Sequence, residues 1–300
     1  MKFLIAGYGS IGSRHFRNLR SLGVDDIVFY RTNKSTIVDD EISGFIIETD
    51  LEKALAHKPD AVIVSNPTSL HLGVAIPAAK AGCNLLIEKP LSHNLERIDE
   101  LRKIIDQTGK KALIGFQYRY HPGLQKINKS LSDGEIGKPI SVRAHWGEYL
   151  PSWHPWEDYR DGYSARADLG GGVILTLCHP FDYLRWLLGE INTVHAFLGY
   201  SGELGLTEVE DTAEINLKFE NGVIGSVHLN FNQSPPVHDL EIIGTEGTIC
   251  WNGLEGTLKI FQSKTGKWKD YFLPENFERN DLFLSEVKHF IEILKTGLLI

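Results

Sequence analysis

The first 121 residues alternate short apolar runs with longer segments in which apolar residues recur with helical spacing. Strands buried on both faces are predicted at 3–6, 27–30, 60–64, 84–87 and 112–115. Helices are predicted at 13–22, 51–57, 71–81 and 94–108. This alternation predicts an α/β unit with a parallel, doubly wound sheet, and ligands of such sheets bind at the carboxyl ends of the strands.

Beyond residue 121 the pattern changes to successive strands with few helices between them. Strands are predicted at 140–149, 194–200, 212–219, 223–231, 240–243, 248–251 and 257–261. Helices are predicted at 171–188 and 282–294, and Asn221-Gly222 indicates a hairpin. We therefore expect two domains, 1–121 and 122–300, the second an α/β domain with an open, mostly antiparallel mixed sheet. One sheet face needs a cover, which predicts a homodimer or homotetramer through that face.

A glycine motif follows the first strand directly and opens the first helix. In this βαβ context the spacing G-x-G-x-x-G is typical of a dinucleotide site, with the phosphates at the helix N-terminus. The expected contacts are Gly7, Gly9, Ser10, Ile11 and Gly12. The alternative is a glycine-rich turn that binds no ligand.

The end of the second strand is where NAD enzymes usually carry an acid that binds the ribose 2′-hydroxyl. Here residues 30–35 contain no acid and two bases, Arg31 and Lys34. Arg31 and Thr32 are candidates for a 2′-phosphate or the adenine, so the sequence favours NADP over NAD. The alternative for Arg31 is a solvated loop residue.

Polar groups also follow three later strands of the first domain. Because the carboxyl ends of parallel strands share one edge, we expect these groups to complete the cofactor site. They are Ser65, Asn66, His71, Glu88, Lys89 and Gln117.

Composition narrows the functional classes. The net charge of −8 and the lack of a basic stripe argue against a nucleic-acid partner. Three cysteines far apart exclude a disulfide scaffold and a cysteine zinc site, and no histidine spacing suggests a metal. No apolar run has the length of a membrane span, so we expect a cytoplasmic protein without a membrane partner.

Residues 145–166 are rich in aromatic and basic side chains. Aromatic faces suit sugar rings, and arginines suit phosphate or carboxylate. Trp153, Tyr163 and Arg166 are therefore candidate substrate contacts, in a window that also holds His154 and Trp156. For each residue the alternative is a place in the core or an interface.

The chain as a whole resembles the Gfo/Idh/MocA family, named after glucose–fructose oxidoreductase, inositol dehydrogenase and a rhizopine catabolism protein. The resemblance rests on the segments 7–12, 66–71, 88–90, 115–119, 170–172 and 179–182. It implies NAD(P)-dependent hydride transfer at a carbinol of a sugar, an inositol or a related compound, with dimers or tetramers formed through the open sheet.

The resemblance also implies roles for individual residues. Lys89 corresponds to the family's lysine beside the nicotinamide and the reacting oxygen, and Glu88 to a group that positions it. His179 corresponds to the acid–base histidine, and Asp182 keeps the HxxD spacing. Most members have an aspartate three or four residues before this histidine, where this chain has Leu175 and Thr176. Thr176 is therefore a candidate substrate contact. For Lys89 the alternative is a surface lysine that follows a strand. For His179 the alternative is a structural histidine.

Three functions remain at this point. The first is an oxidoreductase that prefers NADP and acts on a sugar, an inositol or a sugar-nucleotide derivative. The second is a cofactor-binding regulator without catalysis. The third is an enzyme that cleaves glycosides by reducing and reoxidising its cofactor within one turnover.

Overall fold

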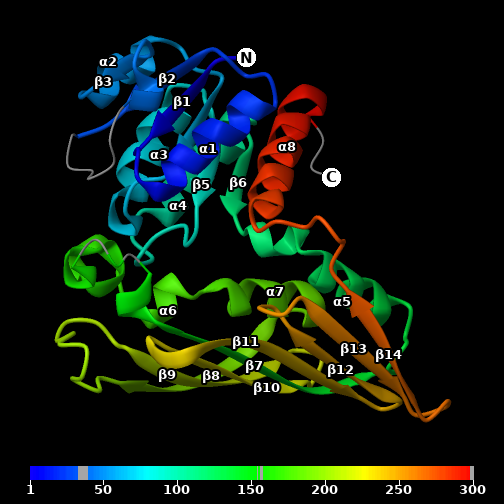
Figure 1. Cartoon of the computed structure of the whole chain (residues 1–300). Coiled ribbons are helices and arrows are strands. Elements are labelled where there is room, and N and C mark those ends of the chain that lie inside the picture. The colour runs from blue at the N-terminus through cyan, green and yellow to red at the C-terminus, as the bar shows by residue number, and fades with distance from the viewer. Residues whose placement is uncertain (33–39, 154, 156–157, 298–300) are drawn as a thin grey trace. The chain divides into compact units, whose positions relative to one another are not determined.

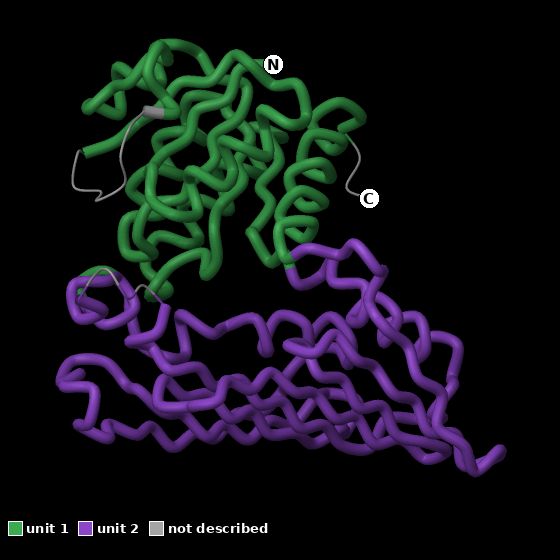
Figure 2. Tube along the Cα trace, in the orientation of Figure 1, with its two compact units in different colours: residues 1–117, 168–170, 279–300 green, residues 118–167, 171–278 purple. Residues whose placement is uncertain are grey.

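The computed structural model describes residues 1–32, 40–153, 155 and 158–297. The chain forms two compact units (Figure 2). Unit 1 comprises residues 1–117, 168–170 and 279–300, and unit 2 comprises residues 118–167 and 171–278. Among the described residues, no helix combines the length and the apolar character that crossing a bilayer requires.

Unit 1 is built on a six-stranded parallel sheet with the order β3-β2-β1-β4-β5-β6 (Figure 1). Its strands are β1 (Phe3–Ala6), β2 (Ile27–Tyr30), β3 (Ile46–Glu48), β4 (Ala61–Val64), β5 (Asn84–Glu88) and β6 (Ala112–Gly115). All residues of β1 and β4 are buried, because helices cover both faces of the sheet. The predicted doubly wound sheet is confirmed.

Alternate residues of β1 enter two different cores, one on each face of the sheet. Phe3 and Ile5 pack with Phe16 and Leu19 of α1 (Ser10–Ser21). Leu4 and Ala6 pack in the other core, with side chains of α3 (His71–Lys80) and α4 (Ile98–Thr108). The short helix α2 (Leu51–Ala56) follows β3 and is capped by Asp50, which accepts a hydrogen bond from the Lys53 N–H.

The last helix, α8 (Asn280–Thr296), belongs to unit 1, although the sequence suggested a single second domain from 122 to the end. Val287, Phe290 and Ile291 are buried in the core that contains Phe3 and Ile5. Helix α8 lies beside α1 in Figure 1, and the two helices contact each other. The amphipathic pattern predicts this helix, but the sheet that it covers depends on contacts far apart in sequence.

Unit 2 contains an eight-stranded sheet with the order β14-β13-β12-β11-β7-β10-β9-β8. Its strands are β7 (Pro139–Tyr149), β8 (Ile191–Gly199), β9 (Thr212–Phe219), β10 (Ile224–Asn230), β11 (Asn232–Gly244), β12 (Gly247–Asn252), β13 (Thr257–Gln262) and β14 (Lys267–Phe272). Within the described strands of this second sheet, only the β10–β7 pair is parallel, so the expected mixed, mostly antiparallel sheet is confirmed.

One face of this sheet is covered by α5 (Pro122–Ser132), α6 (Val173–Thr176) and α7 (His179–Leu188), as Figure 1 shows. On β9, Ala213, Ile215 and Leu217 are buried in the core beneath these helices, whereas Glu214, Asn216 and Lys218 are exposed. Strand β8, at the sheet edge, is exposed along most of its length. No described helix covers the second face.

Two predicted helices begin later than expected. The helix predicted at 94–108 begins at Ile98, because the Asn94 side chain accepts a hydrogen bond from the Glu96 N–H and Arg97 has a φ of +62°. The helix predicted at 171–188 is divided into α6 and α7 by Leu177 and Cys178. Helix α7 then starts afresh with a proline in its first turn, as Pro180 favours.

Candidate functional site

The turn between β1 and α1 holds the three motif glycines. Gly7 has a φ of +100°, and a Cβ there would lie 2.7 Å from the backbone nitrogen of Asn66. At Gly12 a Cβ would overlap the carbonyl oxygen of Gly7. A Cβ on Gly9, in contrast, would meet no described atom within 4 Å. The first and third glycines therefore close the turn, and the second leaves open space beside it.

The N-terminus of α1 faces the end of this turn without a side-chain cap. Gly9 is the N-cap residue and makes no side-chain cap hydrogen bond, and the first turn contains no acid. The N–H groups of Ser10, Ile11 and Gly12 therefore have no acceptor within the helix. An uncapped helix N-terminus of this length is suited to phosphate oxygens.

The loop after β4 supports the glycine turn. The Ser65 hydroxyl donates to the carbonyl oxygens of Ala6 and Gly7, at 3.2 and 3.0 Å. Ser65 thus stabilises the turn from within the protein. Asn66 differs, because its Oδ1 is buried without a hydrogen-bond partner among the described residues. Buried polar atoms are normally paired, so Asn66 is suited to bind a ligand group.

His71 joins this loop to the one after β5. Its Nε2 lies 2.9 Å from the carbonyl oxygen of Asn66, and its Nδ1 lies 2.9 Å from that of Pro90. Burial lowers the pKa of His71, while the two backbone carbonyls act in the opposite direction. Contact between His71 and the cofactor stays a prediction. Its two ring nitrogens face backbone carbonyls, so His71 joins the loops that carry Asn66 and Lys89.

Arg31 follows β2 and is only 6% exposed, so the alternative of a solvated loop arginine is wrong. Its guanidinium carbon lies 5.8 Å from the ring centroid of Tyr8, within the glycine motif. Thr32 is exposed at the end of the described segment. Residues 33–35, the rest of the predicted specificity loop, lie outside the described residues. The structure therefore places Arg31 beside Tyr8 of the glycine motif.

Glu88 and Lys89 lie at the carboxyl end of β5, next to β4 in the sheet. The Glu88 side chain is 8% exposed, and its Oε2 accepts a hydrogen bond from the Lys89 backbone N–H at 3.3 Å. The Lys89–Pro90 peptide is cis. Gln117, after β6, is buried. The expected residues thus follow neighbouring strands along one edge of the sheet, as the doubly wound topology requires.

These residues fit a dinucleotide. The glycine turn offers open space at Gly9, and the α1 N-terminus offers donors for phosphates. The buried Oδ1 of Asn66 offers an acceptor. Arg31 adds a cation at the turn. Lys89 adds a second cation at the carboxyl end of β5, on the sheet edge where ligands of doubly wound sheets bind.

In unit 2, His179 begins α7 and is 3% exposed. Its ring lies 4.8 Å from that of Tyr118 and stacks at 5.5 Å on that of Trp146. The Trp146 ring also stacks on the ring of His238, with the two ring centroids 4.0 Å apart. His179 is therefore held by aromatic faces at a break between two helices, which limits the directions in which its nitrogens can act.

Asp182 lies one turn further along α7. Its carboxylate accepts two hydrogen bonds from Arg119, at 2.9 and 2.7 Å. This bidentate pair raises the pKa of the Arg119 guanidinium above its usual value. Asp182 shares a helix face with His179 by its spacing, but its carboxylate accepts from Arg119. The Asp182 carboxylate therefore holds the segment that carries Tyr118 and Arg119 against α7.

The predicted substrate contacts of unit 2 have different environments. Trp153 packs edge-on against Phe231 and belongs to the border of the core. Tyr163 is 38% exposed, and Arg166 is exposed. Thr176 is buried at the end of α6. His154 and Trp156 lie outside the described residues. Within the described part of the window, the aromatic residues thus divide between core and surface.

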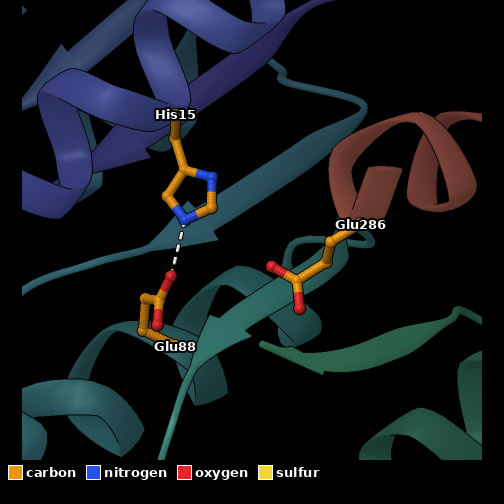
Figure 3. Close-up of side chains that lie close together, drawn as sticks. All are labelled: His15, Glu88 and Glu286. Atoms are coloured by element: carbon orange, nitrogen blue, oxygen red, sulfur yellow. Dashed lines mark hydrogen bonds and ion pairs between the residues drawn. The ribbon is translucent and has the colours of Figure 1, made fainter. Parts of the chain in front are cut away.

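Three residues at these sites were missed by sequence reasoning. One is His238, which stacks on Trp146, a residue of the aromatic window 145–166 that strand alternation puts on the helix-covered face beside His179. His15 and Glu286 lie beside Glu88 (Figure 3). His15 follows the glycine motif by three residues, a spacing that could have indicated a position on the same face of α1 as Gly12. No sequence signal links Glu286 to Glu88.

Two family profiles match the chain. One, described as an oxidoreductase family with an NAD-binding Rossmann fold, matches residues 1–116. The other, described as the GFO/IDH/MocA C-terminal domain, matches residues 124–250.

Individual relatives extend the match over the whole chain. Myo-inositol 2-dehydrogenase of Thermotoga maritima is 30% identical over 315 residues, covering 99% of this chain and 89% of the relative. Scyllo-inositol 2-dehydrogenase (NAD(+)) of Bacillus subtilis is 29% identical, covering 79% and 68%. The structure of a levoglucosan dehydrogenase in complex with NADH and levoglucosan superposes with a TM-score of 0.88 at 20% identity, covering 99% and 90%. At that identity the superposition supports the fold alone.

Proposed function

The chain belongs to the Gfo/Idh/MocA family of oxidoreductases, and on this premise we propose a specific reaction for it. It transfers a hydride between a nicotinamide dinucleotide and a carbinol or ketone of a sugar, an inositol or a sugar-nucleotide derivative. The observation that carries the proposal is the sheet edge of unit 1. There the glycine turn, the buried Oδ1 of Asn66 and Lys89 follow the neighbouring strands β1, β4 and β5.

Lys89 is the residue that exchanges a proton with the substrate oxygen. A bound nicotinamide dinucleotide supplies the hydride acceptor or donor. When a hydride adds to the ketone, negative charge develops on its oxygen, and the ammonium of Lys89 stabilises that charge by a hydrogen bond and donates its proton there. In the direction of oxidation, the neutral amine of Lys89 accepts the proton that the carbinol oxygen loses. Its position after β5, with its backbone N–H on Glu88, supports this role.

His179 is the second group that exchanges a proton with substrate hydroxyls. Its burial and its contacts with Tyr118 and Trp146 support a fixed orientation. Asp182 contributes through Arg119, by holding the start of α7 against the segment of Tyr118. Tyr163 and Arg166 are the candidates for contact with the sugar, because both are exposed. Trp153 and Thr176 support the site from within unit 2.

NADP is the preferred cofactor in this proposal. Arg31 is buried beside the glycine turn, and the described end of β2 carries no acid that would repel a 2′-phosphate. A guanidinium binds phosphate oxygens with charge-assisted hydrogen bonds. NAD remains a usable cofactor, because the glycine turn and the α1 N-terminus do not depend on the 2′ substituent.

The protein forms homodimers or homotetramers through the open face of the unit 2 sheet. No described helix covers that face. Phe197 of β8, opposite the exposed Glu214, is 66% exposed, and Ile224 of β10, opposite the exposed Lys218, is 58% exposed. Apolar residues on a sheet that lacks a cover favour a second copy as the cover. Light scattering after gel filtration tests the mass, and Phe197→Asp should shift it toward the monomer.

A substrate panel tests the proposed reaction. Inositols, levoglucosan, simple sugars and nucleotide sugars are incubated with NAD⁺ and with NADP⁺, and reduced nicotinamide is followed at about 340 nm. We expect an increase with at least one compound. Cofactor binding without turnover across the panel would favour the regulator, and loss of a glycoside without net reduction would favour redox-assisted cleavage.

A further inference from the structure

We propose that His15, Glu88 and Glu286 form one buried positioning unit for Lys89, in which the C-terminal helix α8 supplies the third group (Figure 3). The inference rests on the proposed role of Lys89. The three residues come from α1, β5 and α8, all of them in unit 1.

The Glu88 carboxylate connects His15 to Lys89. Its Oε1 lies 2.6 Å from Nε2 of His15, and its Oε2 accepts from the Lys89 backbone N–H at 3.3 Å. Gly115 on β6 adds a steric constraint, because a Cβ there would lie 3.3 Å from the same carboxylate. A change at His15 would therefore alter the backbone from which the Lys89 side chain starts.

Glu286 brings a second buried carboxylate to this pair. It is fully buried, and one of its oxygens lies within 4.8 Å of the facing atoms of His15 and Glu88. Helix α8 is fixed there by Val287 and Phe290 in the core, and Phe283 packs edge-on against the His15 ring at 6.4 Å. Two buried carboxylates near each other are costly unless a shared proton or a cation offsets them. The imidazole of His15 is the group in the cluster that can carry this proton.

Other charged groups surround the unit. The Glu88 carboxylate raises the pKa of both Arg14 and His71, although burial lowers each of them more strongly. Arg14 lies on α1 with its guanidinium 4.7 Å from the centre of the Phe283 ring. Glu88 is thus the common neighbour of His15, Arg14, His71 and the Lys89 backbone, and Glu286 adds a second buried acid beside it.

The distances favour a shared proton over a metal ion. A nitrogen and an oxygen 2.6 Å apart have the separation of a short, charge-assisted hydrogen bond. In that arrangement His15 Nε2 and Glu88 Oε1 share a hydrogen with each other, so their lone pairs do not both point toward a common metal ion. A bound divalent cation is the competing explanation for a histidine and two carboxylates, and metal analysis of the purified protein tests it directly.

Glu286→Gln tests the unit, with Glu292→Gln on an exposed position of the same helix as the matched control. Hydrogen exchange is measured at the Lys89 amide and in the peptide at the end of β5. We expect Glu286→Gln to accelerate exchange there by about tenfold, with β1 peptides unchanged, because the loss of one acid loosens a local contact. Glu292→Gln should exchange like the natural protein.

Kinetics supply the second readout, with the substrate found in the panel. We expect kcat to fall by about 10- to 100-fold in Glu286→Gln, with little change in KM or in the dissociation constant of the cofactor. Glu286→Asp should recover part of kcat. His15→Gln, which retains a donor for Glu88 but no charge, should give the same loss, and the double variant should lose no more than either single one.

Several results would overturn the unit. One is an unchanged hydrogen-exchange rate at the Lys89 amide in Glu286→Gln, and another is a rate that rises equally throughout unit 1. The others are losses of kcat that add up in the double variant, and one metal ion per chain in the purified protein. If Glu286→Gln fails to fold, His15→Gln replaces it in the exchange experiment, with Glu292→Gln again as the control. Hydrogen exchange needs no substrate, so it tests the positioning unit even if no turnover is found. Absence of turnover would count against the proposed function alone.

Discussion

Arg119 donates two hydrogen bonds to the carboxylate of Asp182, from Nε at 2.9 Å and from Nη2 at 2.7 Å. The Asp182 side chain is 8% exposed and that of Arg119 is 45% exposed. The HxxD spacing suggests that Asp182 partners His179, but its carboxylate binds Arg119 instead. This pair holds the first turn of α7 against the segment that carries Arg119.

This pairing predicts a stability effect. Asp182→Asn should lower the free energy of unfolding by about 1–2 kcal/mol, because the charge-assisted pair with Arg119 is lost. The effect stays this small because Arg119 is partly exposed to water. The exposed pair of Arg160 and Asp158 is the matched control, and Asp158→Asn should have a smaller effect. Urea unfolding measures both. Equal effects would show that the Arg119 pair is no more than a surface contact.

His179 should be needed for turnover rather than for cofactor binding. His179→Ala is expected to reduce kcat by about 10²- to 10⁴-fold, the usual range for an acid–base residue. The dissociation constant of the cofactor, measured by nicotinamide fluorescence, should stay within about twofold. His195→Ala, on the exposed strand β8, is the control. Wild-type turnover in His179→Ala would remove this residue from the chemistry.

Arg31 should determine the choice between the two dinucleotides. A charge-assisted bond to a 2′-phosphate contributes about 1.5–3 kcal/mol, which corresponds to about 10- to 150-fold in affinity. We expect tighter binding of NADPH than of NADH, and Arg31→Ala should remove most of the difference. Arg17→Ala, at an exposed arginine of α1, should leave the ratio unchanged. Equal affinities in the natural protein at moderate salt would refute the preference.

His121 should make the stability of unit 2 depend on pH. Its Nδ1 caps α5 by accepting from the Gly123 N–H at 3.0 Å, and burial lowers the pKa of His121 from 6.5 to about 4. Between these values the unfolded chain binds the extra proton, so stability falls as the pH falls through this window. The expected loss is about 3 kcal/mol, at about 1.36 kcal/mol per pKa unit.

Urea unfolding across this pH range measures that loss. His121→Asn keeps an acceptor at the helix N-terminus and removes the titrating group, so its pH dependence should be weaker by a similar amount. An unchanged pH dependence in the variant would assign the effect to other groups.

The sheet of unit 1 could be predicted because both of its faces are covered. Its main strands are therefore continuous apolar runs, and the glycine motif fixes the first turn. Strands β3 and β14 were missed, and both are largely exposed. Strand β3 has only three residues, and β14 alternates charged residues with aromatic ones instead of forming a continuous apolar run. Helix α5 was missed as well, because its start depends on His121 as a cap and on Pro122 in the first turn.

The candidate site could be predicted only where its residues follow strand ends. Asn66, Glu88 and Lys89 are brought to one edge by topology alone. The partners that fix them are not predictable in this way. Glu286 approaches Glu88 because α8 packs on the sheet of unit 1, and Arg119 reaches Asp182 across 63 positions of sequence. Such contacts depend on packing rather than on local pattern.

Lys89 carries the central claim, and one comparison tests it most directly. Turnover and cofactor affinity are measured for the natural protein, for Lys89→Met and for Lys80→Met, whose lysine is exposed on α3 and paired with Glu100. We predict that Lys89→Met binds the dinucleotide normally but loses kcat by orders of magnitude, because charge stabilisation in the transition state is removed. Lys80→Met should turn over like the natural protein. Undiminished turnover in Lys89→Met would contradict the account.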